Sequence, residues 1–287
     1  MPEQNLTPEI PIESFDIFAD GLDHPECCAF ARDGDLWAGG EAGQIYRIGA
    51  DGKATEVTRL GSFCGGLAFS PHDELFACVP GLGVVHVERS GRHEVFRTEA
   101  AGRGLICPNF PVFDSAGNLY VSDSGDWKGR NGRLVRFGAD GRDLELAAGF
   151  GYANGLALAA DERTLFVVES DTDSVYRLLL DSDGGAGEPQ LFCRPIGHVP
   201  DGLSLDVDGN LYVTCYASHE IYWVSPDRQL LLLARDVNGM LLGGPTNMCF
   251  GGQGYQEIFV SNLCRYTISR AAVGRVGLRP ANLRSAK

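Results

Sequence analysis

The sequence predicts an all-β fold: a six-bladed β-propeller with four antiparallel strands per blade, closed into a ring by its N-terminal strand. Three observations support this prediction. A short phrase occurs six times: an apolar triplet, a polar turn, and then Leu-aromatic-Val or a close variant. The copies are spaced 39 to 47 residues apart, which is typical of propeller blades. The last copy lacks a fourth strand, whereas a strand-like segment precedes the first copy.

The repeated phrase defines the first two strands of each blade. The first triplets end at Phe30, Phe69, Phe113, Leu158, Leu205 and Phe250. The second triplets begin at Leu36, Leu75, Leu119, Leu165, Leu211 and Ile258. Asp-Gly pairs such as 33–34 and 208–209 lie between the two triplets, as expected for the turns of β-hairpins.

Further apolar segments supply the remaining strands. Third strands are expected at 45–48, 84–87, 134–137, 175–178 and 221–224, and fourth strands at positions such as 94–96 and 190–192. The last copy ends near Ala272, so we expect residues 14–18 to complete its blade and remove a free sheet edge. We expect a single domain over residues 1–287 with its core at about 15–275. The absence of WD dipeptides and of a helical period argues against WD40 arrays and α/β folds.

The charge, the apolar runs and the cysteines of the sequence indicate which partners the protein can bind and where in the cell it is expected. The sequence has 24 Lys and Arg residues and 38 Asp and Glu residues, which gives a net charge of -14. Nucleic acid is therefore not an expected partner, and a cation is a better candidate. No apolar run approaches the ~20 residues of a membrane helix, so no membrane partner is expected. The first 13 residues lack a secretory pattern and the nine cysteines form no C-x-x-C pair, so we expect a cytoplasmic protein.

One position of the repeat gathers the candidate ligands. In a propeller the first strand of each blade starts at the central channel, so equivalent positions form a ring around its mouth. Four residues before each triplet end, this ring holds Glu26, Gly65, Asn109, Asn154, Asp201 and Thr246. Carboxylate and amide oxygens suit a hard divalent cation. A simpler interpretation is that the Asn-Gly and Asp-Gly pairs are turn residues, but this does not account for Glu26.

Four short motifs occur in this register and in a defined order. They are Glu26-Cys27-Cys28-Ala29-Phe30, Asn109 followed by Asp114, Asn154-Gly155-Leu156 and Pro200-Asp201-Gly202. Together they resemble the SMP-30/gluconolactonase/LRE-like family of six-bladed propellers, over about residues 15–275. The resemblance implies one divalent metal held by Glu26, Asn154 and Asp201, with Asn109 as a further ligand or a substrate contact. Ca²⁺ is the first candidate for this cofactor, and Zn²⁺, Mn²⁺, Mg²⁺ and Fe²⁺ are alternatives.

Two positions depart from the pattern of this family. Cys107 stands where many of its sugar lactonases carry an Arg, two residues before the position of Asn109. Phe110 replaces an Asp that some members carry after that Asn. These departures weigh against a polyhydroxylated sugar lactone and favour a less polar substrate.

Other candidate residues lie in loops on the face of the ring. The segment 122–133 is the longest connection between second and third strands, and we expect its Asp123 to contact substrate. A plain surface insertion is the alternative. Three histidines on this face could shuttle protons or could be ordinary solvated residues: His24, His198 and His219. Four cysteines lie near the mouth, where small buried residues are the simpler interpretation: Cys27, Cys64, Cys107 and Cys215.

The ring of oxygen ligands predicts a bound cation, and the resemblance to this family implies a metal-dependent hydrolase that opens a lactone by polarising its carbonyl for attack by water. The resemblance further implies that Asp201 combines metal binding with general-base catalysis. One alternative is a non-catalytic ligand-binding propeller that keeps the ring for stability. Another is a strictosidine-synthase-like condensing enzyme, with a Glu base in a hydrophobic pocket and no metal requirement. The expected partner is a small-molecule lactone, and the chain is expected to be a monomer or a small homo-oligomer.

Overall fold

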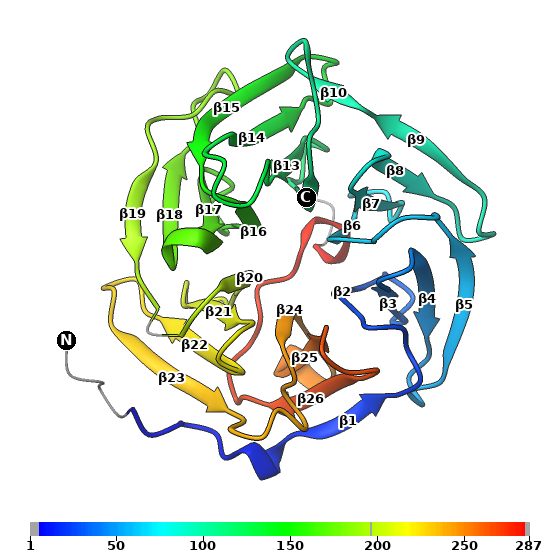
Figure 1. Ribbon diagram of the computed structural model, residues 1–287, viewed down its shortest axis with the longest axis vertical. Helices are drawn as coiled ribbons and strands as arrows, with labels where there is room; N and C mark the ends of the chain where they lie inside the picture. Colours follow the sequence, from blue (N-terminus) through cyan, green and yellow to red (C-terminus); the bar gives the residue numbers. More distant parts are fainter. Residues whose placement is uncertain (1–5, 196, 285–287) are drawn as a thin grey trace.

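Six four-stranded antiparallel sheets surround a central channel in the computed structural model, which describes residues 6–195 and 197–284 (Figure 1). This arrangement confirms the predicted six-bladed propeller. Residues 1–5, part of the stretch predicted not to be a secretory signal, lie outside the described residues.

Five blades are built from consecutive strands, with the innermost strand first. Blade 1 contains β2 (Cys27–Phe30), β3 (Leu36–Gly39), β4 (Gln44–Ile48) and β5 (Ala54–Arg59). Blade 2 contains β6 (Leu67–Phe69), β7 (Leu75–Val79), β8 (Gly83–Val87) and β9 (His93–Arg97). Blade 3 contains β12 (Pro108–Phe113), β13 (Leu119–Asp123), β14 (Gly132–Phe137) and β15 (Asp143–Phe150). Blade 4 contains β16 (Ala153–Leu158), β17 (Thr164–Glu169), β18 (Ser174–Leu179) and β19 (Gln190–Cys193). Blade 5 contains β20 (Pro200–Leu205), β21 (Leu211–Cys215), β22 (Glu220–Val224) and β23 (Leu230–Arg235).

The apolar character of the repeated phrase follows from how the blades pack. Every residue of β3, β7, β13 and β21 is buried, because neighbouring blades cover both faces of these second strands. A strand covered on both faces cannot alternate between apolar and polar residues. The Leu-aromatic-Val triplet that revealed the repeat is therefore a consequence of packing between blades.

Blade 6 combines the two ends of the chain. From the channel outward it contains β24 (Pro245–Gly251), β25 (Glu257–Asn262), β26 (Ile268–Ala272) and β1 (Asp16–Ala19). β1 pairs antiparallel with β26, with Asp16 opposite Arg270, and the two side chains form an ion pair at 3.0 Å. The predicted ring closure is thus confirmed.

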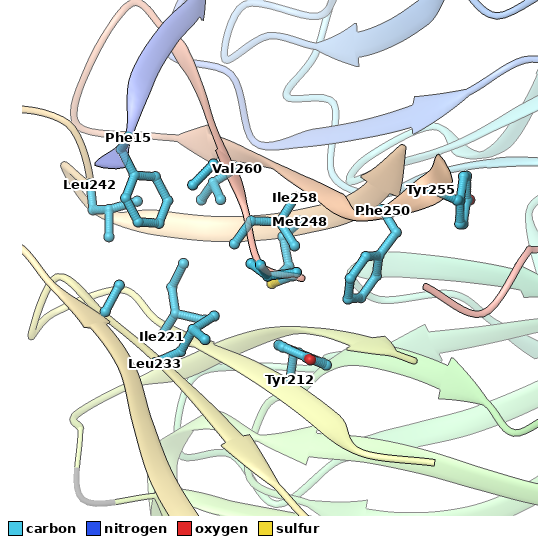
Figure 2. Close-up of a cluster of buried hydrophobic side chains, with 13 residues drawn as sticks. Phe15, Tyr212, Ile221, Leu233, Leu242, Met248, Phe250, Tyr255, Ile258 and Val260 are labelled. Carbon is cyan, nitrogen blue, oxygen red and sulfur yellow. The ribbon is translucent and has the colours of Figure 1, made fainter. Parts of the chain in front are cut away.

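Phe15 anchors the N-terminal segment beside this closure. It follows the 3₁₀ turn η1 (Ile12–Ser14) and is 4% exposed. Its ring belongs to a cluster that includes Ile221 and Leu233 of blade 5 and Val260 of blade 6 (Figure 2). The N-terminal segment therefore contributes core packing as well as backbone pairing.

We expect Phe15→Ala to lower the free energy of unfolding by ~3–5 kcal/mol, because it removes a buried ring and leaves a cavity between two blades. Urea unfolding followed by circular dichroism measures this loss. Ile17→Ala is a control on the same segment, since Ile17 is about half exposed and its truncation should change stability far less, by about 0.5 kcal/mol. Equal stabilities for the two variants would contradict this account of the closure.

Two features of the fold were not predicted. A small hairpin of β10 (Glu99–Ala100) and β11 (Arg103–Gly104) separates blades 2 and 3. The C-terminal segment, with the 3₁₀ turn η4 (Ala281–Leu283), runs across the central opening and is drawn red in Figure 1. Asn282 is buried there and donates hydrogen bonds to the carbonyl of Phe30 and the carboxylate of Asp73.

This C-terminal segment lines one end of a cavity of about 140 Å³ within the channel. The inner strands supply the other walls from the positions that follow the ring residues. The remaining helical elements are the 3₁₀ turns η2 (Ser170–Thr172) and η3 (Gln253–Tyr255). In the described part of the chain, no helix has the length and apolar character needed to cross a membrane.

Candidate metal centre

The ring positions coincide with irregularities in four inner strands. β12, β16, β20 and β24 each shift register against the second strand of their blade near the channel mouth. The shifts fall between Pro108 and Phe110, Ala153 and Leu156, Pro200 and Leu203, and Pro245 and Met248. Asn109, Asn154, Asp201 and Thr246 lie within these stretches. Bulges of this kind redirect side chains and are common next to functional sites.

The glycines that follow two of these residues do not form turns. Gly155 and Gly202 lie inside β16 and β20 and do not have positive φ. A Cβ on Gly155 would lie 2.4 Å from the carbonyl oxygen of Asp201, and one on Gly202 would lie 2.5 Å from that of Thr246. These glycines let successive inner strands approach closely around the channel. The interpretation of the Asn-Gly and Asp-Gly pairs as turn residues is therefore wrong.

The ring also explains why blade 2 supplies no ligand. A Cβ on Gly65 would lie 2.7 Å from the carbonyl oxygen of Asn109, so the neighbouring backbone leaves no room for a side chain. Thr246 of blade 6 donates its hydroxyl to the carbonyl oxygen of Glu26 at 2.7 Å. Two of the six positions thus serve the structure of the ring, and four remain for a ligand.

Each of these four residues is buried and has a side-chain oxygen without a hydrogen-bond partner. The oxygens are Oε2 of Glu26, Oδ1 of Asn109, Oδ1 of Asn154 and Oδ1 of Asp201. Buried polar atoms in proteins are nearly always paired, so four unpaired acceptors at equivalent positions need an explanation. One cation can satisfy several such oxygens at once. The residues present therefore fit a divalent metal ion bound by oxygen ligands.

The electrostatics of the two carboxylates point the same way. Burial, followed by the nearby negative charge of Asp201, raises the pKa of Glu26 well above its usual value. Burial raises the pKa of Asp201 to about 8, and contact with Asn154 offsets part of the rise. Among the described residues, no Lys or Arg side chain acts to lower the pKa of either carboxylate. A divalent cation would supply the missing positive charge and favour both ionised forms.

Two tyrosines beside the ring were not predicted from the sequence. Burial, Cys107, and the charges of Asp201 and Glu26 all raise the pKa of Tyr152. A hydrogen bond with Cys264, burial, and the same two carboxylates raise the pKa of Tyr216 to about 12. Both phenols therefore stay protonated near neutral pH and can donate hydrogen bonds. Tyr152 stands two residues before Asn154, and this closeness to a ring residue was the available signal.

Asp123 does not lie in the ring. It is the last residue of β13, is fully buried, and forms an ion pair at 3.0 Å with Arg133, which is also fully buried. Its carboxylate also accepts the backbone N–H groups of Ile106 at 2.9 Å and Cys107 at 2.7 Å. Both oxygens are occupied, so this placement does not support the predicted substrate contact. Asp123 instead fixes the backbone that carries Cys107.

We expect Asp123→Asn to lower the free energy of unfolding by ~1–3 kcal/mol, because it removes the fully buried counter-charge of Arg133 and leaves the partly exposed Glu145, 3.3 Å away, as the ionic partner of the guanidinium. Chemical denaturation measures the loss. The double variant Asp123→Leu with Arg133→Met removes both charges and should recover much of that stability. A single variant as stable as the parent chain would show that the pair does not hold this region together.

The predicted histidines lie at the rim in separate settings. The Nδ1–H group of His24 donates a hydrogen bond to the carbonyl oxygen of Leu263 at 2.7 Å. His198 is exposed, with Nδ1 3.4 Å from Asp173. His219 accepts the backbone N–H of Gly244 through Nδ1 at 2.9 Å. None of the three makes a described hydrogen bond to a ring side chain.

The predicted cysteines and one further cluster complete the rim. Cys27, Cys64 and Cys215 are buried, as the simpler interpretation of these thiols requires, whereas Cys107 is partly exposed. Asp23, His24 and Glu41 place possible ligand atoms within 4.8 Å of one another, and Asp23 and His24 come shortly before the ring residue Glu26 in the sequence. Of this cluster, the sequence had singled out only His24.

Comparisons with known proteins identify a matching family and several relatives. A family model described as the SMP-30/Gluconolactonase/LRE-like region matches residues 24–263. A gluconolactonase of Zymomonas mobilis is 32% identical over 184 residues, which make up 56% of this chain and 49% of that protein. The chain spans about half the length of curated relatives such as this one.

Solved structures show the same fold at low sequence identity. A gluconolactonase from Xanthomonas campestris has a TM-score of 0.79 and 19% identity, covering 90% of this chain and 89% of that one. A calcium-binding protein, regucalcin from Agrobacterium tumefaciens, has a TM-score of 0.78 and 15% identity, covering 98% of this chain and 100% of that one.

Proposed function

Because the chain belongs to the SMP-30/gluconolactonase/LRE-like family, we propose that it is a hydrolase that opens a lactone with the help of one divalent cation. The observation that carries this proposal is the set of four buried, unpaired oxygens contributed by blades 1, 3, 4 and 5. The relative named gluconolactonase supports lactone hydrolysis, and the calcium-binding neighbour supports a metal in this fold.

Glu26, Asn154 and Asp201 would hold the cation, and Asn109 would be a further ligand or would contact the substrate. The donor set consists of carboxylate and amide oxygens, which favours Ca²⁺, Mg²⁺ or Mn²⁺ over Zn²⁺ and Fe²⁺. Among these, Ca²⁺ tolerates the irregular geometry of ligands from separate blades best. When bound, the cation would supply Lewis-acid polarisation of the lactone carbonyl.

Side chains of the protein would carry out the proton transfers of the reaction. Asp201 would accept the proton of the attacking water through the carboxylate oxygen that does not hold the cation. The ring oxygen of the lactone leaves as the acyl C–O bond breaks, and the same proton can then neutralise it. Tyr152 and Tyr216 remain protonated beside the carboxylates and can donate hydrogen bonds to substrate oxygens.

Metal analysis combined with a lactone panel tests the proposal. The purified chain is analysed for bound metals, and hydrolysis is followed by proton release before chelation, after chelation, and after adding back each of the five candidate cations. We expect activity to disappear with the metal and to return with Ca²⁺. Metal binding without turnover of any lactone would favour a ligand-binding propeller. Turnover that survives complete removal of metal would exclude the role assigned to the ring.

A further inference from the structure

An aromatic pair borders the candidate site on the side of blades 3 and 4. Trp127, in the loop between β13 and β14, contacts Tyr152 edge to face, with ring centroids 5.1 Å apart. The indole of Trp127 is 49% exposed. Tyr152 is partly buried and stands two residues before the ring residue Asn154. Its hydroxyl and the Cys107 thiol are close enough to shift each other's pKa. The two rings thus lead from solvent toward the ring of oxygens.

Other loops of the same face also expose apolar side chains. These loops follow strands that run toward the ring end of the channel. They carry Ile106 before β12, Val237 and Met240 between β23 and β24, and Tyr266 between β25 and β26, each at least 44% exposed. Exposed apolar groups gathered around a polar centre mark a site that binds an apolar partner or ligand.

Two of the charged groups near the aromatic pair are engaged elsewhere. Arg130 pairs with Glu169 at 2.8 Å, and Asp126 accepts a hydrogen bond from Asn131 at 3.0 Å. The backbone N–H of Cys107 is bound to Asp123. A substrate group placed against Trp127 and Tyr152 would therefore meet aromatic carbon and a thiol. Such a surface cannot compensate the loss of water from several hydroxyl groups.

Resting on the proposed function, we infer that the substrate is a lactone with an apolar alkyl or aryl substituent, which packs against Trp127 and Tyr152 while the lactone carbonyl faces the ring of oxygens. The aromatic pair then determines which lactones are used, and the ring performs a reaction common to all of them. A polyhydroxylated sugar lactone would lack partners at this wall.

A chain-length series at constant ring size tests the inference. kcat/KM of the metal-saturated protein is measured for δ-valerolactone, δ-hexalactone, δ-octalactone and δ-decalactone, and for glucono-δ-lactone. Each methylene that becomes buried should raise kcat/KM by up to about fourfold. Glucono-δ-lactone should be used at least tenfold less well than δ-octalactone. Equal or better use of glucono-δ-lactone would overturn the inference while leaving the lactonase proposal intact.

Substitutions locate the effect on the aromatic pair. Trp127→Ala should flatten the dependence on chain length, and Trp127→Phe should keep most of it. Val207→Ala is the control, since Val207 is comparably exposed on a hairpin at the opposite end of the channel. A dependence that is unchanged in Trp127→Ala would show that the substituent binds elsewhere.

A binding measurement separates this inference from the proposed hydrolysis. An alkyl-substituted δ-lactam resembles the substrate but resists hydrolysis, and its binding can be followed by calorimetry. Affinity that rises with alkyl length and falls in Trp127→Ala would support the inference even if no lactone were turned over. Absence of binding to the whole lactam series would overturn it.

Discussion

Asp201→Asn is expected to lower kcat by ~10²–10⁴-fold when the variant is saturated with metal. The substitution keeps an oxygen donor and the shape of the side chain, but it removes the group proposed to accept the proton of water. Activity should therefore fall much further than metal occupancy. Steady-state rates and metal content are measured on the same samples. Asp227→Asn is the matched control, since Asp227 is exposed on a hairpin far from the ring.

Near-normal turnover of Asp201→Asn after metal has been restored would place the base elsewhere. His24 would then be the next candidate, because Nδ1 is held by the carbonyl of Leu263 and Nε2 is left to take a proton. His198 is less favourable because it is exposed and faces Asp173. A loss of activity near pH 6.5 that leaves the metal bound would point to a histidine.

Metal removal is expected to reverse the pH dependence of stability contributed by the ring. In the metal-free protein the pKa of Asp201 is about 8, above its value of 3.8 in the unfolded chain. This contribution to stability is therefore complete below pH 3.8 and is lost as the pH rises through about 8. Melting temperatures in chelator should fall between pH 5 and pH 9. Saturating Ca²⁺ should stabilise most at the upper end, because protons no longer compete with the metal.

Glu26→Gln is expected to weaken metal binding while it stabilises the metal-free protein. It should weaken metal binding at least tenfold, because a ligand charge is lost. It should also stabilise the metal-free protein above pH 8, because one of two buried like charges is gone. Glu188→Gln, at an exposed position, is the control. A variant that is less stable both with and without metal would instead indicate a purely structural role for Glu26.

The repeat made most of the fold predictable. Each copy carries its own apolar triplets and turns, so six weak local signals reinforced one another. The ring could be found by counting because four inner strands carry an irregularity at the same place, which preserves the offset from the triplet end. The N-terminal strand was recognisable because its absence from the last copy left a blade incomplete.

Features outside the repeat could not be predicted in this way. Asp123 seemed available because its loop was taken to start at residue 122. In the structure β13 extends to Asp123, and β14 places Arg133 directly opposite. Tyr152 shares its offset, six residues before the triplet end, with His24, Phe63 and Cys107, but this position has no common residue type and did not stand out. No other blade has a tyrosine at the offset of Tyr216, so comparison between copies could not reveal it. The C-terminal segment is held by single contacts of different kinds, such as Leu278 N–H to the carbonyl of Leu205 and the ion pair of Arg284 with Glu162, which form no repeated sequence pattern.

Blade 6 combines strands from both ends of the chain, and this affects the order in which the blades can form during synthesis. Asp16 and its partner Arg270 are 254 residues apart, so β1 leaves the ribosome first and finds its place last. At ~5–20 residues per second, this interval lasts roughly 10–50 s. During that time blades 1 to 5 can form in sequence, while β1 remains an unpaired segment. β1 has only four residues, so it exposes few unpaired backbone groups with which a neighbouring nascent chain could pair and aggregate.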